Sequence, residues 1–541
     1  MEIENHHHST LGDRLFIFIL QIRHLIEGHP ELYLFTVYSA CIWILWVIKV
    51  LVSRRYRPFT GTYTGTTSVV VPVVDEPLDL FRDVIERMVE QKPGEIIVVI
   101  NGAENPALQA VCEEYAPLVR WVHTPIPGKR NAVMIGTNMS KGDITVLVDS
   151  DTVWMPNALD ELVKPFADSR VGGVTTRQRI LEPERSWITR WADWLENSRS
   201  LYSMPAQSVM GQVGCLPGRT IAFRRSILMT VMDKFMTERF MGVFLEVSDD
   251  RTLTNLTLKE GYRTVYQHTS LVYTDAPLQV KKLFKQQLRW ARGSQYNTLR
   301  MLPWMLGHAP LLALFFVMDI ILPFLLAGVI GGWAYRALSG QGYNFYEGLL
   351  SEYGVQSGIL AIVALMVVSS VLSMGIRQMR HLGEKPSDFF RLPIFILAST
   401  FFLMPIRLIG FFRMGHASGW GTRAGAYAGG GQDDATDAAR EQAVEHPGHL
   451  STPGAASLGD IDSSWALSTS NGLAGGDGAA LTHSEGSVLT AERRAETIRP
   501  IVQKPVTRQS TPRRRLNPKA AFPYLIGFTI FFVEAVLLVQ V

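Results

Sequence analysis

The sequence has little of what several common classes of protein require. Only three cysteines occur in 541 residues, Cys41, Cys112 and Cys215, and they lie far apart without metal-ligand spacing. A disulfide framework and a zinc site are therefore not indicated, and the main domain is expected to face the cytosol. The net charge is only +3, and no basic run is interleaved with aromatic residues, so no nucleic-acid partner is expected.

Long apolar runs, in contrast, are frequent. Hydrophobic residues make up 47% of the chain and gather strongly in some segments. The N-terminal segment 1–31 holds a short apolar run without the layout of a signal peptide. A spanning helix needs about 20 apolar residues. Four segments meet this requirement and are expected to be transmembrane helices: 32–52, 308–334, 356–376 and 521–541.

Basic flanking residues predict the orientation of these helices. Three arginines follow the first of them, so residues 53–307 are expected to be a cytosolic domain. A further apolar run at 391–412 contains Arg407 and has basic residues on both sides, so an interfacial or re-entrant helix is expected there. Segment 413–427 and a long insert at 428–520 would then be cytosolic. The insert is poor in large apolar residues and is expected to be disordered.

Two features leave two interpretations open. Asp319 and Glu534 lie within the expected spans, where a carboxylate either has a function or forms a hydrogen bond between helices. Residues 183–203 place three tryptophans on one helical face, which suits a helix in the membrane interface or a helix packed on the domain itself.

Residues 60–275 alternate short β-branched apolar runs with helical stretches. Such alternation predicts an α/β domain with a doubly wound sheet, in which ligands bind at the carboxyl ends of the strands. The expected strands are 68–74, 96–100, 119–123 and 145–148, and the expected helices are 77–91, 105–115, 129–140 and 156–168.

Polar residues follow these strands. Asp75 and Glu76 end the first strand and Asn101 ends the second, where their side chains can bind a base and a ribose. Lys129 opens a helix directly after a glycine, which suits contact with phosphate or uracil. Taken alone, each of these features also fits an ordinary turn or helix start.

Asp149 and Asp151 follow the strand 145–148 with one serine between them. Two carboxylates this close raise each other's proton affinity unless a cation lies between them. Mg²⁺ or Mn²⁺ held in this way can bridge a nucleotide diphosphate. An isolated Asp-x-Asp is common by chance, but its position after a buried strand favours the metal-site interpretation.

A second acidic pair, Asp249 and Asp250, opens a helical stretch about a hundred residues later. Aspartates are favoured at helix N-termini, so a structural role is one interpretation. The other is a general base that removes a proton from an attacking hydroxyl. Because metal ligation occupies the lone pairs that a base needs, two separate acidic sites fit two roles.

Gln286, Arg289 and Trp290 follow as Gln-Gln-Leu-Arg-Trp in a basic, amphipathic stretch. Arginine offers a planar fork for phosphate oxygens, and tryptophan offers a flat face for a sugar ring. The stretch also fits a juxtamembrane interfacial helix, and both interpretations can hold together.

In this order, the motifs resemble those of the processive family 2 glycosyltransferases, the hyaluronan, chitin and cellulose synthases. The resemblance covers roughly residues 60–425, and the run from Ser248 to Asn255 is especially similar to a hyaluronan synthase motif. It implies a GT-A-like domain in a multi-pass protein of the plasma membrane. It also implies inverting, metal-assisted transfer from a UDP-sugar to a growing extracellular or cell-wall polysaccharide acceptor, with the lipid bilayer as a further partner.

The resemblance also assigns roles to residues. Asp250 would be the base in the catalytic pair with Asp249, Asp151 would bind Mg²⁺ or Mn²⁺, and Asp149 would contact metal or nucleotide. The remaining nucleotide, diphosphate and acceptor contacts would come from Asp75, Glu76, Asn101, Lys129, Gln286, Arg289 and Trp290, and from a gating-loop motif that includes Trp420, Thr422 and Arg423.

The likeness is strongest to fungal synthases of cell-wall or capsule polysaccharide, because Val-Ile-Asn-Gly stands at 99–102 where hyaluronan synthases carry an acidic pair. Ser248 also stands in place of a glycine. The main alternative is a lipid-linked sugar transferase that acts once per substrate. A transporter or scaffold is a third interpretation, but it leaves the cytosolic carboxylates unexplained.

Overall fold

The computed structural model describes residues 30–540 except 127, 241, 243–246, 341–349, 352–353, 362, 365–372, 374 and 416–520. The predicted disordered insert at 428–520 therefore lies outside the described residues, as do most of segment 413–427 and part of the predicted span 356–376. The gating-loop residues Trp420, Thr422 and Arg423 also lie outside them.

The centre of the domain is an eight-stranded sheet with the order β3-β2-β1-β4-β7-β6-β8-β5. Its first half is parallel, as predicted, and consists of β1 (Thr67–Val73), β2 (Glu95–Asn101), β3 (Val119–Thr124) and β4 (Ile144–Val148). Strands β1, β2 and β4 are buried on both faces, which explains their nearly continuous apolar sequences.

The second half of the sheet is mixed and was not predicted. It consists of β5 (Thr152–Trp154), β6 (Val171–Ile180), β7 (Thr220–Arg224) and β8 (Arg263–Thr274). Strand β7 is antiparallel to both β4 and β6, and β6 runs parallel to β8. The result is a GT-A-like mixed sheet whose parallel half ends beside β7.

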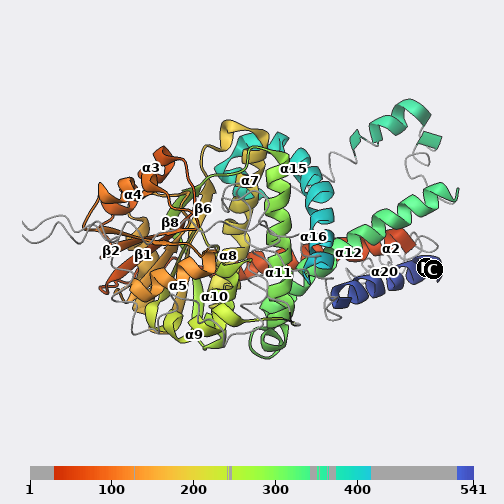
Figure 1. Ribbon diagram of the computed structural model, residues 1–541. Helices are drawn as coiled ribbons and strands as arrows, with labels where there is room; N and C mark the ends of the chain where they lie inside the picture. Colours follow the sequence, from red (N-terminus) through yellow and green to blue (C-terminus); the bar gives the residue numbers. More distant parts are fainter. Residues whose placement is uncertain are drawn as a thin grey trace, which may run out of the picture.

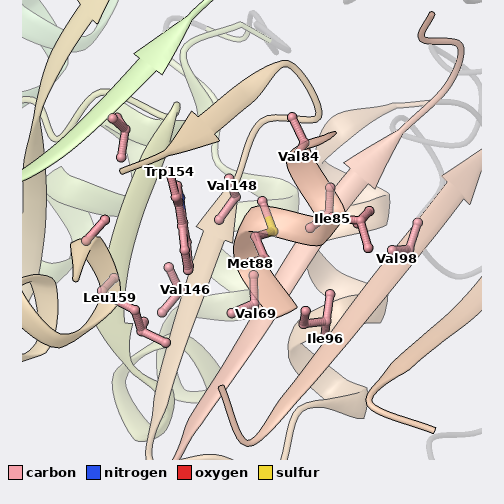
Figure 2. Packing of buried hydrophobic residues seen from close by; sticks show 14 of the residues in the cluster. Val69, Val84, Ile85, Met88, Ile96, Val98, Val146, Val148, Trp154 and Leu159 are labelled. Atoms are coloured by element: carbon pink, nitrogen blue, oxygen red, sulfur yellow. The ribbon is translucent and has the colours of Figure 1, made fainter. Parts of the chain in front are cut away.

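Helices cover both faces of the sheet. Figure 2 shows α3 packing Val84, Ile85 and Met88 onto one face, over strand residues such as Val69 and Ile96. The opposite face is covered by α5 and α9, which form a second core. The helices that pack around the sheet are α3 (Leu78–Glu90), α4 (Pro106–Glu113), α5 (Lys129–Met139), α6 (Ala158–Val163), η1 (Lys164–Ala167), α9 (Arg225–Thr237) and α10 (Asp249–Lys259).

The other helices join the sheet to the membrane segments. They are η2 (Pro183–Arg185), α7 (Trp187–Ser198), η3 (Arg199–Ser203), α8 (Met204–Met210), α11 (Val280–His308), α14 (Met379–Glu384) and η5 (Pro386–Phe390). Trp191 and Trp194 of α7 are buried against α15, and the Trp191 indole donates a hydrogen bond to the Phe395 carbonyl at 3.1 Å. Trp187 stays 53% exposed, so α7 both packs on the protein and leaves one aromatic ring at the surface.

Within the described part of the chain, three helices are long and apolar enough to cross a membrane by length and composition: Tyr33–Ser53, Pro310–Leu338 and Leu392–Arg413. They correspond to α2 (Pro30–Ser53), α12 (Pro310–Leu338) and the run formed by α15 (Leu392–Ala398), η6 (Ser399–Leu403) and α16 (Met404–Arg413). A shorter apolar helix, α20 (Phe522–Gln540), occupies the last predicted span.

These helices have two orientations in Figure 1. The α15–α16 run stands upright beside α11, whereas α2, α12 and α20 extend away from the domain, across that direction. The interfacial interpretation of residues 391–412 stays a prediction, and this arrangement agrees with it.

Two charged residues of the apolar segments lie next to each other, because Arg407 is 3.9 Å from the Asp319 carboxylate of α12. Glu534 of α20 is buried against Gly328 of α12.

Candidate active site

The two aspartates of the Asp-Ser-Asp motif lie in the turn between β4 and β5. Glu76, at the end of β1, is buried and accepts a hydrogen bond from the Ser150 hydroxyl at 2.7 Å, which fixes this turn to the neighbouring strand. Burial, and then the nearby charge of Asp149, raise the pKa of Asp151 to about 6. Glu76 therefore holds the turn, while the two aspartates concentrate negative charge above it.

Lys129 stands where α5 begins, after Gly128, whose φ of 126° suits a residue without a side chain. Its ammonium group forms an ion pair with Asp149. Burial would lower the pKa of Lys129, but Asp149, with Asp249 and Asp250 further away, raises it instead. A positive group thus faces both acidic motifs, and its role as a phosphate contact stays a prediction.

Asp249 and Asp250 begin α10 and point to different partners. Asp249 is buried and accepts a hydrogen bond from Arg130 Nε at 2.7 Å. Asp250 accepts hydrogen bonds from the backbone N–H groups of Gly218, at 3.1 Å, and Arg251, at 2.8 Å. Burial raises the pKa of Asp250, although the charge of Lys129 opposes the shift. Asp250 and the ammonium group of Lys129 both lie close to Gly218, and the charge of Asp249 also acts on Lys129.

Gln286, Arg289 and Trp290 lie on one face of α11, because positions three and four apart are neighbours on a helix. Gly293, one turn further along that face, contacts Ser248 directly. Burial lowers the pKa of Arg289, while Asp149, Asp250, Asp249 and Asp151 oppose this shift in that order. The helix therefore brings the Gln-x-x-Arg-Trp motif onto the two acidic sites.

The two remaining predicted nucleotide contacts differ in exposure. Asp75 is exposed where β1 ends, whereas Asn101 is completely buried at the end of β2. Neither polar atom of the Asn101 side chain has a hydrogen-bond partner among the described residues. Both residues lie at the carboxyl edge of the parallel strands, where the fold places ligands.

Three further residues near the acidic motifs, Arg219, Glu196 and Gln178, were not predicted from the sequence. Arg219 lies between the two acidic motifs, and its side chain contacts Glu196 of α7 and Gln178 of β6. No local spacing links these three positions, because they come from three separate elements. The only available signal was that Arg219 directly follows the Gly-Cys-Leu-Pro-Gly run that ends at Gly218.

The carboxylates suit a divalent cation bound together with a nucleotide. No three His, Cys, Asp or Glu side chains of the described ranges gather closely enough to hold a metal by themselves. Mg²⁺ is usually held by only one or two carboxylates, with phosphate oxygens and water completing its ligands. Asp149 and Asp151 supply such a pair of carboxylates. Asp149 already binds one positive group, the ammonium of Lys129.

A GT-A-like sheet with two acidic sites, joined by α11 to apolar helices, defines a membrane-associated glycosyltransferase. Residues 65–293 match the family model described as Glycosyltransferase like family 2. The N-acetylglucosaminyltransferase of Rhizobium meliloti (strain 1021) is 31% identical over 328 residues, which are 58% of this chain and 73% of that protein. The chain belongs to the family 2 glycosyltransferases.

Two further comparisons extend over more of the chain. A hyaluronan synthase of Streptococcus pyogenes is 27% identical over 431 residues, which are 77% of this chain and 97% of the relative. A solved structure, the mannosyltransferase PcManGT from Pyrobaculum calidifontis in complex with GDP-Man and Mn²⁺, has a TM-score of 0.49 at 17% identity. It covers 71% of this chain and 97% of that one. The predicted similarity to processive synthases is confirmed, and the fungal similarity stays a prediction.

Proposed function

We propose that this chain transfers a sugar with inversion from a UDP-sugar to the end of a growing polysaccharide, with the help of a divalent metal, and that it adds many sugars before releasing its product. The observation that carries this proposal is the position of Asp250. It is a buried carboxylate held by two backbone N–H groups, beside Lys129 and under the face of α11 that bears Arg289 and Trp290.

Asp250 is suited to the role of general base. Its raised pKa makes the carboxylate a stronger proton acceptor than an exposed aspartate, which favours removal of a proton from an acceptor hydroxyl. The hydrogen bonds from Gly218 and Arg251 fix its two oxygens, so the carboxylate is oriented before substrate binds. Asp249 is occupied by Arg130, and we therefore assign it to holding the start of α10.

The charge on a departing UDP needs positive partners. Lys129 and Arg289 both lie among the four carboxylates, and both can donate to diphosphate oxygens. A metal ion bound by Asp149 and Asp151 would supply further stabilisation of the diphosphate. Asp75 and Asn101, at the strand ends, are the proposed contacts of the uridine.

Repeated addition requires the acceptor to stay bound between steps. Trp290 offers a ring surface for a sugar next to the base, and α11 continues into α12 after the single residue Ala309. The acceptor surface is thus joined directly to a helix that can span the bilayer. The similarity to hyaluronan synthases over most of their length supports this part of the proposal.

We place the protein in the plasma membrane with residues 53–307 in the cytosol. Glycosylation tags inserted after residues 345 and 430 test this orientation. Modification at 345 alone is expected, because 391–412 is proposed to lie in the interface. Modification at 430 would contradict it and would make Leu392–Arg413 a spanning helix.

The decisive experiment uses the purified full-length protein in detergent with a panel of UDP-sugars and Mg²⁺ or Mn²⁺. UDP release together with products of many sugar units is the expected result. A single added sugar on a lipid would favour the lipid-linked transferase instead. Asp250→Asn should abolish transfer, whereas Asp233→Asn, an exposed carboxylate on α9, is the matched control and should not.

A further inference from the structure

Arg219 joins the two acidic motifs through its backbone. Its carbonyl oxygen accepts a hydrogen bond from the Asp149 N–H at 3.0 Å. The preceding residue, Gly218, donates its N–H to Asp250. These two hydrogen bonds fix the backbone at Gly218 and Arg219 whenever the two acidic sites are assembled. The Cα atom from which the Arg219 side chain extends is therefore fixed as well.

The side chain of Arg219 is also fixed at its far end. Its Nη1 lies 2.9 Å from the Glu196 carboxylate and 3.1 Å from Gln178 Oε1. The Arg219 and Glu196 side chains are each only 12% exposed. Burial alone would raise the pKa of Glu196, but Arg219 and then Arg199 lower it, so this carboxylate stays ionised and keeps its hold on the guanidinium.

The guanidinium that is held in this way lies over the indole of Trp290, with 5.7 Å between Arg219 Cζ and the ring centroid. A cation at this distance from an aromatic face is attracted to it. The guanidinium therefore lies against one face of the ring.

We propose that Arg219 is a positioning residue, held by Glu196 and Gln178, which covers one face of Trp290 so that a sugar of the acceptor stacks only on the other face. This inference rests on the proposed polysaccharide synthase function. Arg219 itself need not touch the substrate, because its effect passes through the orientation of Trp290. The guanidinium is required for its planar shape as well as its charge, and lysine supplies only the charge.

The test compares Arg219→Lys and Glu196→Gln with the wild type in detergent, and it measures the donor KM, the rate of UDP release and the length of the polymer. Product length depends on the ratio of elongation to release of the chain. The free energy of a cation–π contact corresponds to about a 2- to 30-fold change in an equilibrium constant. Both variants should therefore shorten the polymer by about this factor. The donor KM and UDP release should change less.

Arg300→Lys is the matched control. Like Arg219, Arg300 pairs with a largely buried carboxylate, Glu238 at 2.7 Å, and lies over an aromatic ring, Tyr296, but it lies outside the proposed site. It should lower the melting temperature without changing the polymer length. If Arg219→Lys instead lowers only the melting temperature, as this control should, Arg219 is only structural and the inference fails.

Two other outcomes also decide the matter. A rise in donor KM as large as that of Arg289→Lys would make Arg219 a ligand of the diphosphate and would overturn its positioning role. A wild-type chain that makes no polymer from any donor would overturn the proposed function, and the inference with it. Normal polymer from the wild type and an unchanged length in Arg219→Lys would overturn the inference alone.

Discussion

Arg130 Nε lies 2.7 Å from Asp249 Oδ1, and both side chains are almost completely buried. The neighbouring Asp250 has no such counter-charge in direct contact and is held by backbone N–H groups instead. Two adjacent carboxylates at the start of one helix thus have different partners, a guanidinium for Asp249 and backbone N–H groups for Asp250. The difference predicts opposite effects of removing each charge.

Asp249→Ala should destabilise the protein. It removes the carboxylate that pairs with the buried Arg130 guanidinium, and breaking a buried pair in this way typically costs about 3–5 kcal/mol. A clear fall of the melting temperature in detergent is expected, and transfer should be lost only as far as the fold is lost. Glu114→Ala breaks the exposed pair with Arg82 and should leave the melting temperature nearly unchanged. An equally small effect of both changes would show that the Asp249 pair is dispensable.

Asp250→Asn should stabilise the protein at neutral pH. Burial raises the pKa of Asp250 in the folded state above its unfolded value, which is about 4 for aspartate. Protonation of Asp250 therefore stabilises the fold, and this contribution is complete below the unfolded pKa. This contribution is lost as pH rises through the folded pKa. Between pH 4 and 8, the melting temperature of the variant should increase relative to that of the wild type as pH rises. A variant that is less stable than the wild type throughout would contradict the sign of this shift.

The same raised pKa predicts the pH dependence of catalysis. The base must be ionised, so kcat/KM should fall on the acid side with an apparent pKa above about 4. Asp250→Asn should lower transfer by about 10²- to 10⁴-fold, the usual contribution of a general base, while UDP binding measured by calorimetry remains. Loss of UDP binding to the same degree would reassign Asp250 to the nucleotide site.

Ser248 and Gly293 should behave as a coupled pair. Ser248 has a φ of 59°, which glycine adopts more easily, and a Cβ added to Gly293 would lie 2.8 Å from Ser248 Cβ. Gly293→Ala should therefore lower stability by about 1–3 kcal/mol through crowding. Adding Ser248→Gly should recover much of the loss. Simple additivity in this double-mutant cycle would mean that the two residues do not press on each other.

Asp151→Ala should weaken nucleotide binding only when metal is present. Titration of UDP with and without Mn²⁺, and after treatment with a chelator, measures this directly. The wild type should lose affinity on metal removal, and the variant should resemble the metal-free wild type. Metal-dependent binding that persists in the variant would remove Asp151 from the metal site.

The parallel half of the sheet could be predicted because strands such as β2, Glu95–Asn101, are buried on both faces and are nearly continuously apolar. Strand β6 could not, because it mixes glycines, threonines and arginines. Its Gly173 is small because Phe223 and Leu216 leave no room for a Cβ. That constraint comes from the packing of distant segments and has no local pattern.

The same distinction separates the site residues. Asp149, Asp151 and Asp250 could be proposed from the sequence because each lies in a short motif beside a strand or at a helix start. Arg219 and Glu196 were not, since they meet only after α7 has docked on the domain. The two helical interpretations of residues 183–203 could not be decided for a similar reason, because burial of the tryptophans depends on α15.

Strand β6 presents successive residues to opposite sides. Arg177 and Arg179 bind Glu384 of α14, which leads into the α15–α16 run, and Gln178 between them reaches Arg219. Residues of a strand are only about 3.3 Å apart. The contacts of β6 with Glu384 and with Arg219 are therefore joined by a short stretch of strand backbone. Lateral pressure in the bilayer should therefore alter how long the polymer grows more than how fast donor is consumed, which reconstitution into membranes of different thickness would reveal.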